Sequence, residues 1–209
     1  RPIRRAYERN DADIMKWKSE TYPRIKKMAK KQGAEIFWLD EASIRSDDPL
    51  MRTWGLKGQT PVVKTSGQRQ GINVISAISN NGGFWYHLFS GKFNADKFIE
   101  CMRDLMANRK KPVFIIMDGH PVHKSKKVKD FVSQSNGRLS IFLLPPYAPE
   151  LNPDELVWNY IRQTGTARSP LKEGESLYER TFIDLELIAQ DKKLVKSFFK
   201  KPEVSFAAA

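Results

Sequence analysis

A near-continuous apolar run, "PVFIIMD" (Pro112–Asp118), limits the fold of this chain more than any other stretch. Strands with such runs are buried on both faces, because helices cover both sides of the parallel sheet that contains them. An amphipathic basic helix is expected next, from His123 to about Ser135, followed by a second buried-strand pattern, "LSIFLLP". This strand–helix–strand order predicts parallel neighbours in one sheet.

Further strand patterns precede this unit. "EIFWLD" (Glu35–Asp40) and "PVVK" are two of them, and "GINVISAISNNGGFWYHLFS" contains strands joined by a strong hairpin signal, Asn80 to Gly83. An amphipathic helix with Asn94 as its cap then leads to the apolar run. The predicted fold is therefore α/β: a mixed sheet of three antiparallel strands followed by βαβα, with helices on both faces.

The flanking segments have helical patterns. Two short basic helices are expected in residues 10–32: Asn10 caps the first, Tyr22-Pro23 interrupts, and Gly33 ends the second. After Gly165 the chain becomes polar and then helical through about Phe199. We therefore expect a helical lead-in at 1–32, one α/β domain at 33–165 and a helical tail at 166–209.

The charge of the chain points to a polyanionic partner. Lysine and arginine number 36 against 24 acidic residues, which gives a net charge of +12 and a pI of about 9.8. Nucleic acid is favoured over an anionic membrane, because no amphipathic basic helix has an aromatic face; solvated surface lysines are the alternative. We expect no membrane span and no signal peptide. The single cysteine, Cys101, excludes an internal disulfide and favours a reducing compartment.

Three acids occupy positions where chemistry is expected. Asp40 and Asp118 each end a strand pattern, and Glu155 is the third residue of a helix predicted to start with Asn152 and Pro153. Turns explain a lone strand-terminal aspartate, and a capping box, with Glu155 returning to the Asn152 amide, explains Glu155. Three converging carboxylates repel one another, however, and Mg²⁺ or Mn²⁺ would relieve that repulsion.

Four segments resemble, in order and spacing, the catalytic domain of Tc/mariner-like transposases, in particular the bacterial insertion-sequence 630 branch: "FWLDEASIR", "WGLKGQTPVV", "FIIMDGHPVHKS" and "LLPPYAPELNPDELVWNYIR". The resemblance covers residues 33 to 162. It implies a ribonuclease-H-like fold at 33–165 in which Asp40, Asp118 and Glu155 form a catalytic, metal-binding triad. Asp154 is the rival to Glu155, since family members more often have an apolar residue there; its side chain is expected to point away.

The resemblance also implies an activity. Mg²⁺, with Mn²⁺ as substitute and two ions bound, would support DNA cleavage at transposon ends and transfer of the 3′-hydroxyl strand into target DNA. A nuclease of the same fold without strand transfer and a non-catalytic, domesticated DNA-binding remnant remain alternatives. Residues expected to contact DNA are His123, Lys124, Lys126, Lys127, Arg45 and Lys57.

Other expectations concern the setting of the domain. The family carries helix-turn-helix domains that read transposon ends, and nothing before Gly33 is long enough to be one, so the recognition domain is expected to be missing from this chain. A homodimer in the nucleoid-associated cytoplasm of a bacterium is expected. Trp54, Trp85 and Trp158 are expected in the core.

Overall fold

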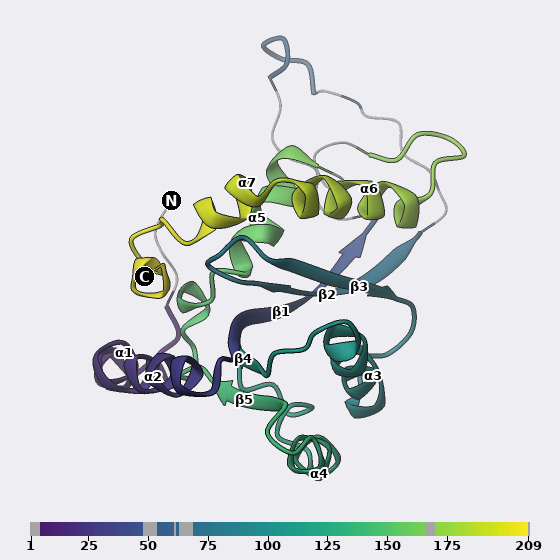
Figure 1. Ribbon diagram of the computed structural model, residues 1–209. Helices are drawn as coiled ribbons and strands as arrows, with labels where there is room; N and C mark the ends of the chain where they lie inside the picture. Colours follow the sequence, from purple (N-terminus) through teal and green to yellow (C-terminus); the bar gives the residue numbers. More distant parts are fainter. Residues whose placement is uncertain (1–4, 48–53, 61, 63–68, 166–169, 209) are drawn as a thin grey trace.

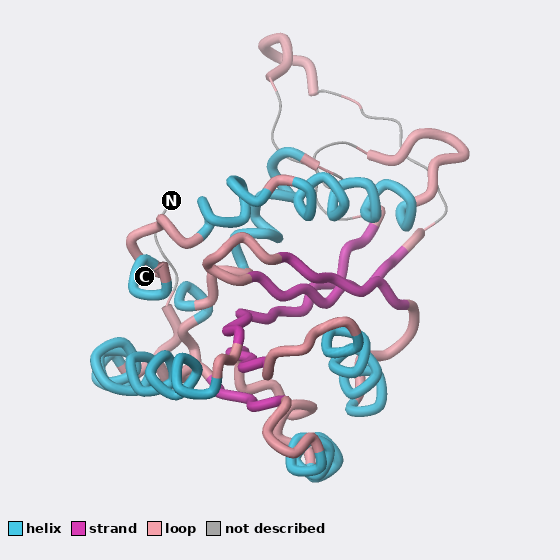
Figure 2. Tube along the Cα trace, in the orientation of Figure 1, coloured by secondary structure: helices cyan, strands magenta, loops and turns pink. Residues whose placement is uncertain are grey.

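The structure, a computed structural model, describes residues 5–47, 54–60, 62, 69–165 and 170–208. At its centre is a five-stranded sheet in the order β3–β2–β1–β4–β5, with helices on both faces (Figures 1 and 2). β1 pairs antiparallel with β2 and parallel with β4, β2 pairs antiparallel with β3, and β4 pairs parallel with β5. The predicted mixed sheet is confirmed; its strands are β1 (Glu35–Arg45), β2 (Gly71–Ile78), β3 (Phe84–Phe89), β4 (Val113–Met117) and β5 (Leu139–Leu143).

β1 differs from its predicted extent. It continues five residues beyond Asp40, because antiparallel pairing with β2 persists to Arg45 opposite Gly71. Parallel pairing with β4 stops earlier, at Trp38 opposite Ile116. At Asp40, β1 is therefore paired with β2 alone, which leaves room for a site on its other side. The strand expected at "PVVK" lies outside the described residues, except for Val62.

Alternation along the strands divides the core into two layers. Phe37 and Leu39 of β1 face α3 (Ala95–Ala107) and α4 (Lys126–Gln134). Trp38 and Ile44 face the opposite side, where the cluster includes residues of α5 (Glu155–Thr164), α6 (Leu177–Gln190) and α7 (Lys192–Phe198). Figure 1 shows α5, α6 and α7 on one side of the sheet and α3 and α4 on the other.

The N-terminal helices are continuous rather than separate. α1 (Asp11–Lys16), a π-helical turn η1 (Trp17–Thr21) and α2 (Tyr22–Gln32) follow one another without a break. Asn10 caps α1, and Gly33 ends α2 at φ 66°, as predicted. Pro23 has no N–H to donate, so the regular bonding pattern fails beside it, and the Tyr22 N–H bonds to the carbonyl of Trp17 instead.

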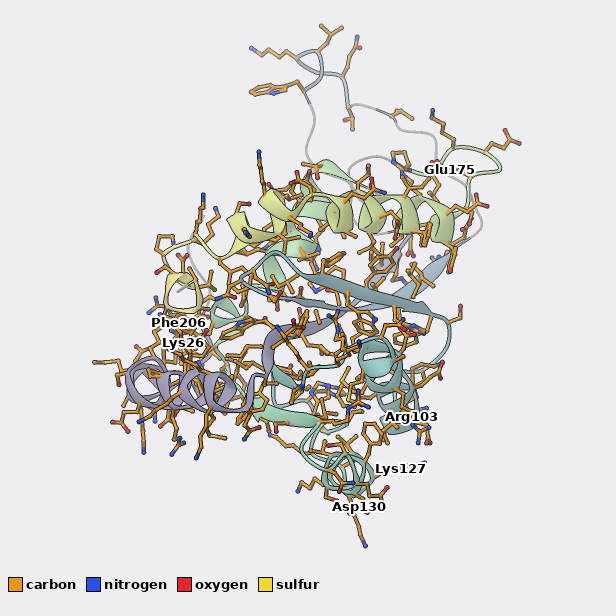
Figure 3. The ribbon with its side chains drawn as sticks, in the orientation of Figure 1. Lys26, Arg103, Lys127, Asp130, Glu175 and Phe206 are labelled. Carbon is orange, nitrogen blue, oxygen red and sulfur yellow. The ribbon has the colours of Figure 1, made fainter. Side chains whose placement is uncertain are left out.

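The C-terminal residues pack on the same core as the sheet. Leu185 of α6 and Val195 of α7 are fully buried in the cluster that contains Trp38. The Phe206 ring, labelled in Figure 3 and part of η4 (Ser205–Ala207), lies edge-on to Tyr22 and Trp38, at centroid distances of 5.3 and 5.8 Å. The division at residues 32 and 165 stays a prediction.

The three tryptophans expected in the core differ in burial. Trp158 is buried, as predicted, whereas Trp85 is only partly buried and donates to Asp104. The prediction for Trp54 is wrong: its side chain is fully exposed. Among the described helices, none has the length and apolar character needed to cross a membrane.

Candidate active site

The three predicted acids meet at one pocket of about 470 Å³. Asp40 comes from the middle of β1, Asp118 directly follows β4, and Glu155 opens α5. Much of the remaining lining is the loop at 143–149, which leads from β5 to the short 3₁₀-helix η2 (Pro149–Leu151). The fold thus gathers side chains that are far apart in sequence at the end of the parallel strands, where α/β sheets hold their ligands.

The start of α5 explains how Glu155 is presented. Asn152 Oδ1 accepts a hydrogen bond from the Asp154 N–H at 3.1 Å, but it does not cap the helix as predicted: α5 begins at Glu155 with Asp154 at its N-cap, so Glu155 is the first helical residue and not the third. The reciprocal bond expected from Glu155 is not formed: the Asn152 N–H donates to the Pro149 carbonyl at 2.9 Å. Asn152 Nδ2 also donates to the Leu39 carbonyl at 2.9 Å, which fixes the helix start beside β1. The Glu155 carboxylate therefore does not accept the capping hydrogen bond from the Asn152 N–H.

Asp40 and Glu155 lie in surroundings that disfavour their charged forms. Burial, followed by repulsion from Glu155 and Asp154, raises the pKa of Asp40 well above its ordinary value. Burial also raises the pKa of Glu155, against an opposing attraction from Arg162. The indole Nε1 of Trp158 donates to Asp40 Oδ2 at 3.0 Å. A cation at this pocket would favour the charged carboxylates and so oppose both the burial and the repulsion that raise these pKa values.

Asp118 has the opposite balance. A hydrogen bond from His123 is the main cause that lowers the pKa of Asp118, and the His120 N–H adds to it by donating to Asp118 Oδ1 at 2.9 Å. The Asp118 side chain is also more than half exposed. Of the three acids, Asp118 is thus the one held ionised by its neighbours.

His123 is buried rather than placed on the surface. Its side chain is 0% exposed, with Nε2 2.8 Å from Glu41 Oε1 and Nδ1 3.3 Å from Asp118 Oδ1. Burial alone lowers the pKa of His123, but the bonds to Asp118 and Glu41 outweigh it and raise the pKa to about 9. His123 also precedes the helix that it was expected to start, because α4 begins at Lys126 with Ser125 as its cap. Its buried ring is placed to hold Asp118 rather than to meet DNA.

Sequence reasoning missed Glu41. It follows Asp40 in β1, and strand alternation turns its side chain to the α3 and α4 side of the sheet, where His123 lies. Among the described residues, one group has potential metal-ligating atoms that all lie within 4.8 Å of one another. It consists of Glu41, Asp118 and His123. In this group the His123 imidazole lies between the two carboxylates, with Nε2 toward Glu41 and Nδ1 toward Asp118.

Asp154 is separated from the pocket. It is 0% exposed, does not line the cavity, and accepts a hydrogen bond from Ser76 Oγ at 2.7 Å through Oδ2. Its Oδ1 has no hydrogen-bond partner in the described part of the chain. Burial raises the pKa of Asp154 well above its ordinary value. Asp154 is thus absent from the pocket lining, although its carboxyl is near enough to Asp40 to affect the pKa of Asp40; that its side chain points away stays a prediction.

Of the six residues expected to contact DNA, Lys124 lines the pocket and the other five do not. Lys124 lies over Gly119, where an added Cβ would come within 2.9 Å of Nζ. Lys126 and Lys127 begin α4, where Figure 3 labels Lys127. Lys127 pairs with Asp96 of α3. Arg45 pairs with Asp47 at 3.0 Å, and Lys57 is exposed in a turn.

The pocket and fold agree with a sequence comparison. A family described as "DDE superfamily endonuclease" matches residues 35–178, more than half of the chain. The chain belongs to this family. The match includes every strand of the sheet and all three acids of this DDE superfamily chain.

Relatives of this DDE superfamily chain are insertion elements and transposases. The insertion element IS630 uncharacterized 39 kDa protein of Shigella sonnei is 26% identical over 133 residues, which are 63% of this chain and 38% of that protein. The Mos1 transposase paired-end complex with left transposon end superposes with a TM-score of 0.68 at 17% identity, covering 99% of this chain and 64% of that one. The catalytic domain of Mos1 mariner transposase superposes with a TM-score of 0.61 at 15% identity, and the match covers 96% of this chain and 93% of that one. These structures confirm the fold, and this chain spans less than two thirds of the first two relatives.

Proposed function

We propose that this chain is the catalytic domain of a DDE transposase, which cleaves DNA at transposon ends and joins the resulting 3′-hydroxyl to target DNA. The observation that carries the proposal is the meeting of Asp40, Asp118 and Glu155 at one pocket. Membership of the endonuclease family and the likeness to mariner transposase folds support it. The net charge of +12 suits a chain that holds a polyanion around an acidic centre.

The three acids fit divalent cations. Their donors are hard carboxylate oxygens, and burial with mutual repulsion keeps the pKa of Asp40 high in the protein alone. Mos1 complexes have been described with Mg and with Mn. We infer that Asp40, Asp118 and Glu155 hold two Mg²⁺ ions, with Mn²⁺ as substitute. Such ions activate the attacking oxygen and stabilise the leaving one in phosphodiester displacement.

The neighbouring residues position the acids. Trp158 fixes the Asp40 carboxylate, and Asn152 ties the start of α5 to β1. His123, itself held by Glu41, fixes Asp118. Lys124 offers a positive charge to a DNA phosphate at the same pocket. These contacts keep the carboxylates in place while DNA binds and leaves.

Plasmid nicking with single-residue variants tests the proposal. In Mg²⁺ or Mn²⁺ the wild-type chain should nick supercoiled DNA, whereas Asp118→Asn and Glu155→Gln should not. Matched controls are Asp104→Asn, which changes an aspartate of similar exposure on α3, and Glu179→Gln, which changes a first-turn glutamate of α6. If the first two variants nick DNA as fast as the controls, the acids are not the catalytic set.

A second assay separates transposase from nuclease. Pre-cut oligonucleotides with a 3′-hydroxyl should be joined to a target plasmid by the wild-type chain and not by Glu155→Gln. Nicking without joining, when the recognition domain of the family is supplied in the same reaction, would favour a nuclease that lacks strand transfer. Neither nicking nor joining would favour the DNA-binding remnant. The dimer, the missing recognition domain and the bacterial cytoplasm remain predictions.

A further inference from the structure

One segment supplies an apolar part of the pocket that the acids do not explain. The loop "LLPPYAP" (143–149) lines the cavity along its whole length. Leu144 and Ala148 are buried and support the loop, whereas the Tyr147 side chain is 55% exposed. The same pocket therefore offers carboxylates, a lysine and an exposed aromatic ring.

Tyr147 has a backbone conformation that tyrosine rarely adopts. Its φ is +55°, in a left-handed region that turns normally give to glycine or asparagine. The other non-glycine residue with positive φ among those described is an asparagine, Asn136. Three prolines around Tyr147, at 145, 146 and 149, restrict the loop and hold it in this conformation.

The described contacts give no structural reason for the ring. Within the part of the chain that the structure describes, Tyr147 makes no aromatic contact and its hydroxyl forms no hydrogen bond. Glycine at this position would relieve the strained φ and would lose little packing. A bulky residue kept in a strained, exposed position beside reactive groups indicates a functional role.

A nucleotide matches both parts of this pocket. Its phosphate suits the cation-binding acids and Lys124, while its base has two apolar faces. We propose that the Tyr147 ring stacks on the nucleobase next to the phosphate being cut, so that residues 143–149 form a base-binding subsite. This inference rests on the proposed function and names the part of the DNA that the site grips. Stacking on tyrosine tolerates any base, which suits a pocket that does not read sequence.

A second pocket adjoins the first. It has a volume of about 450 Å³ and shares Pro149, Asn152 and Glu155 with the first. Its other walls include Asn159 of α5 and Lys201, together with the acids Glu150 and Glu203.

Binding to oligonucleotides of defined structure tests the stacking. Affinities are measured in Ca²⁺, to limit cleavage, for a duplex with a single-stranded tail and for copies with one abasic site at each position near the junction. Tyr147→Ala should weaken binding roughly 5- to 100-fold, and Tyr147→Phe should keep it, because stacking needs the ring and not the hydroxyl. Tyr178→Ala is the control: Tyr178 is 51% exposed on α6 and lines neither pocket.

Tyr147→Gly separates binding from folding. It should weaken DNA binding as much as Tyr147→Ala while leaving the melting temperature unchanged or higher, since glycine accepts the positive φ. A lower melting temperature with unchanged affinity would mean that the ring supports the loop, and the inference would be wrong.

The abasic copies provide the decisive comparison. If Tyr147 stacks on one base, one abasic position should weaken wild-type binding and have almost no further effect on Tyr147→Ala. Additive losses at every position would overturn the stacking, even where wild-type protein nicks DNA and the proposed function stands. Failure of the wild-type protein to cut any of these DNAs in Mg²⁺ or Mn²⁺ would instead remove the proposed function, and the inference with it.

Discussion

Trp158 Nε1 donates a hydrogen bond to Asp40 Oδ2 at 3.0 Å and so ties the helix that carries Glu155 to the strand that carries Asp40. A second link between the same segments runs from Asn152 Nδ2 to the Leu39 carbonyl, at 2.9 Å. Asp40 is thus held by a residue of α5, the helix that carries Glu155, and the start of that helix is held by β1, the strand that carries Asp40.

The indole of Trp158 should therefore affect catalysis as well as packing. Trp158→Phe removes the donor to Asp40, and a hydrogen bond to a charged group is worth about 1.5–3 kcal/mol, so we expect DNA nicking to slow roughly 10-fold or more. Trp17→Phe is the control, because Trp17 is also buried and its Nε1 has no hydrogen-bond partner in the described structure. Equal nicking rates for the two variants would contradict the positioning role.

Glu41 should act on Asp118 through His123. Glu41→Gln removes the charge that holds the imidazole, and changes to groups that orient ligands typically reduce metal affinity or activity about 10- to 100-fold. We expect slower nicking and a higher Mn²⁺ requirement, with DNA affinity in Ca²⁺ unchanged. His87→Asn is a control, since His87 also lies between two acids, Glu100 and Asp104, but outside the pocket. A loss of DNA affinity in Glu41→Gln would instead indicate a general disturbance of the site.

Loss of charge should reduce DNA nicking far more at Glu155 than at Asp154. The buried Asp154 has a raised pKa and a hydrogen bond from Ser76 that an asparagine oxygen can still accept. Asp154→Asn should therefore nick DNA within about 3-fold of the wild type, whereas Glu155→Gln should lose about 100-fold or more. The reverse order in the same nicking assay would identify Asp154 as the third acid.

Lys124 and Lys127 should differ in their contribution to DNA binding. The log–log dependence of affinity on salt has a slope of about −0.9 per phosphate neutralised, so Lys124→Gln should make the slope less negative by about that amount. Lys127→Gln should change it less, because Asp96 already pairs with Lys127. Titrations at several salt concentrations measure both slopes. Equal changes would mean that DNA contacts α4 as closely as the pocket.

Tyr22 should make the protein sensitive to alkali. Burial raises the pKa of Tyr22 to about 12, and its hydroxyl donates to the Ala207 carbonyl at 3.4 Å. The stability from the neutral phenol is complete below the unfolded pKa of about 10 and is lost as pH rises through the folded pKa, by about 2–3 kcal/mol in total.

Denaturant unfolding between pH 10 and 12 measures this loss. Tyr22→Phe should lose less stability over that window than the wild type, because it has no phenol to ionise. Tyr7→Phe, at a fully exposed position, should follow the wild-type curve. Parallel curves for Tyr22→Phe and the wild type would show that another group causes the alkaline loss.

Several features followed from local sequence. The run Val113–Met117 is buried at every residue because five consecutive apolar side chains suit a strand covered on both faces. Asn10 and Asn94 cap the N-termini of α1 and α3, and Gly33 caps the C-terminus of α2, as expected. These features are local because capping depends on a few adjacent atoms. The positions of Asp40, Asp118 and Glu155 along the chain likewise indicated one site, and the structure brings them to one pocket.

Other features depended on residues distant in sequence. β1 continues past Asp40 because β2 pairs with it, and the exposed Trp54 shows that aromatic character alone does not decide burial. The contact between His123 and Glu41 joins residues 82 positions apart, and the bond between Ser76 and Asp154 joins residues 78 apart. Local pattern determined which side chains favour burial or a helix end. The partner of each buried charge was decided by the sheet order, because a charge in a low-dielectric interior is stable only beside the group that the tertiary fold places there.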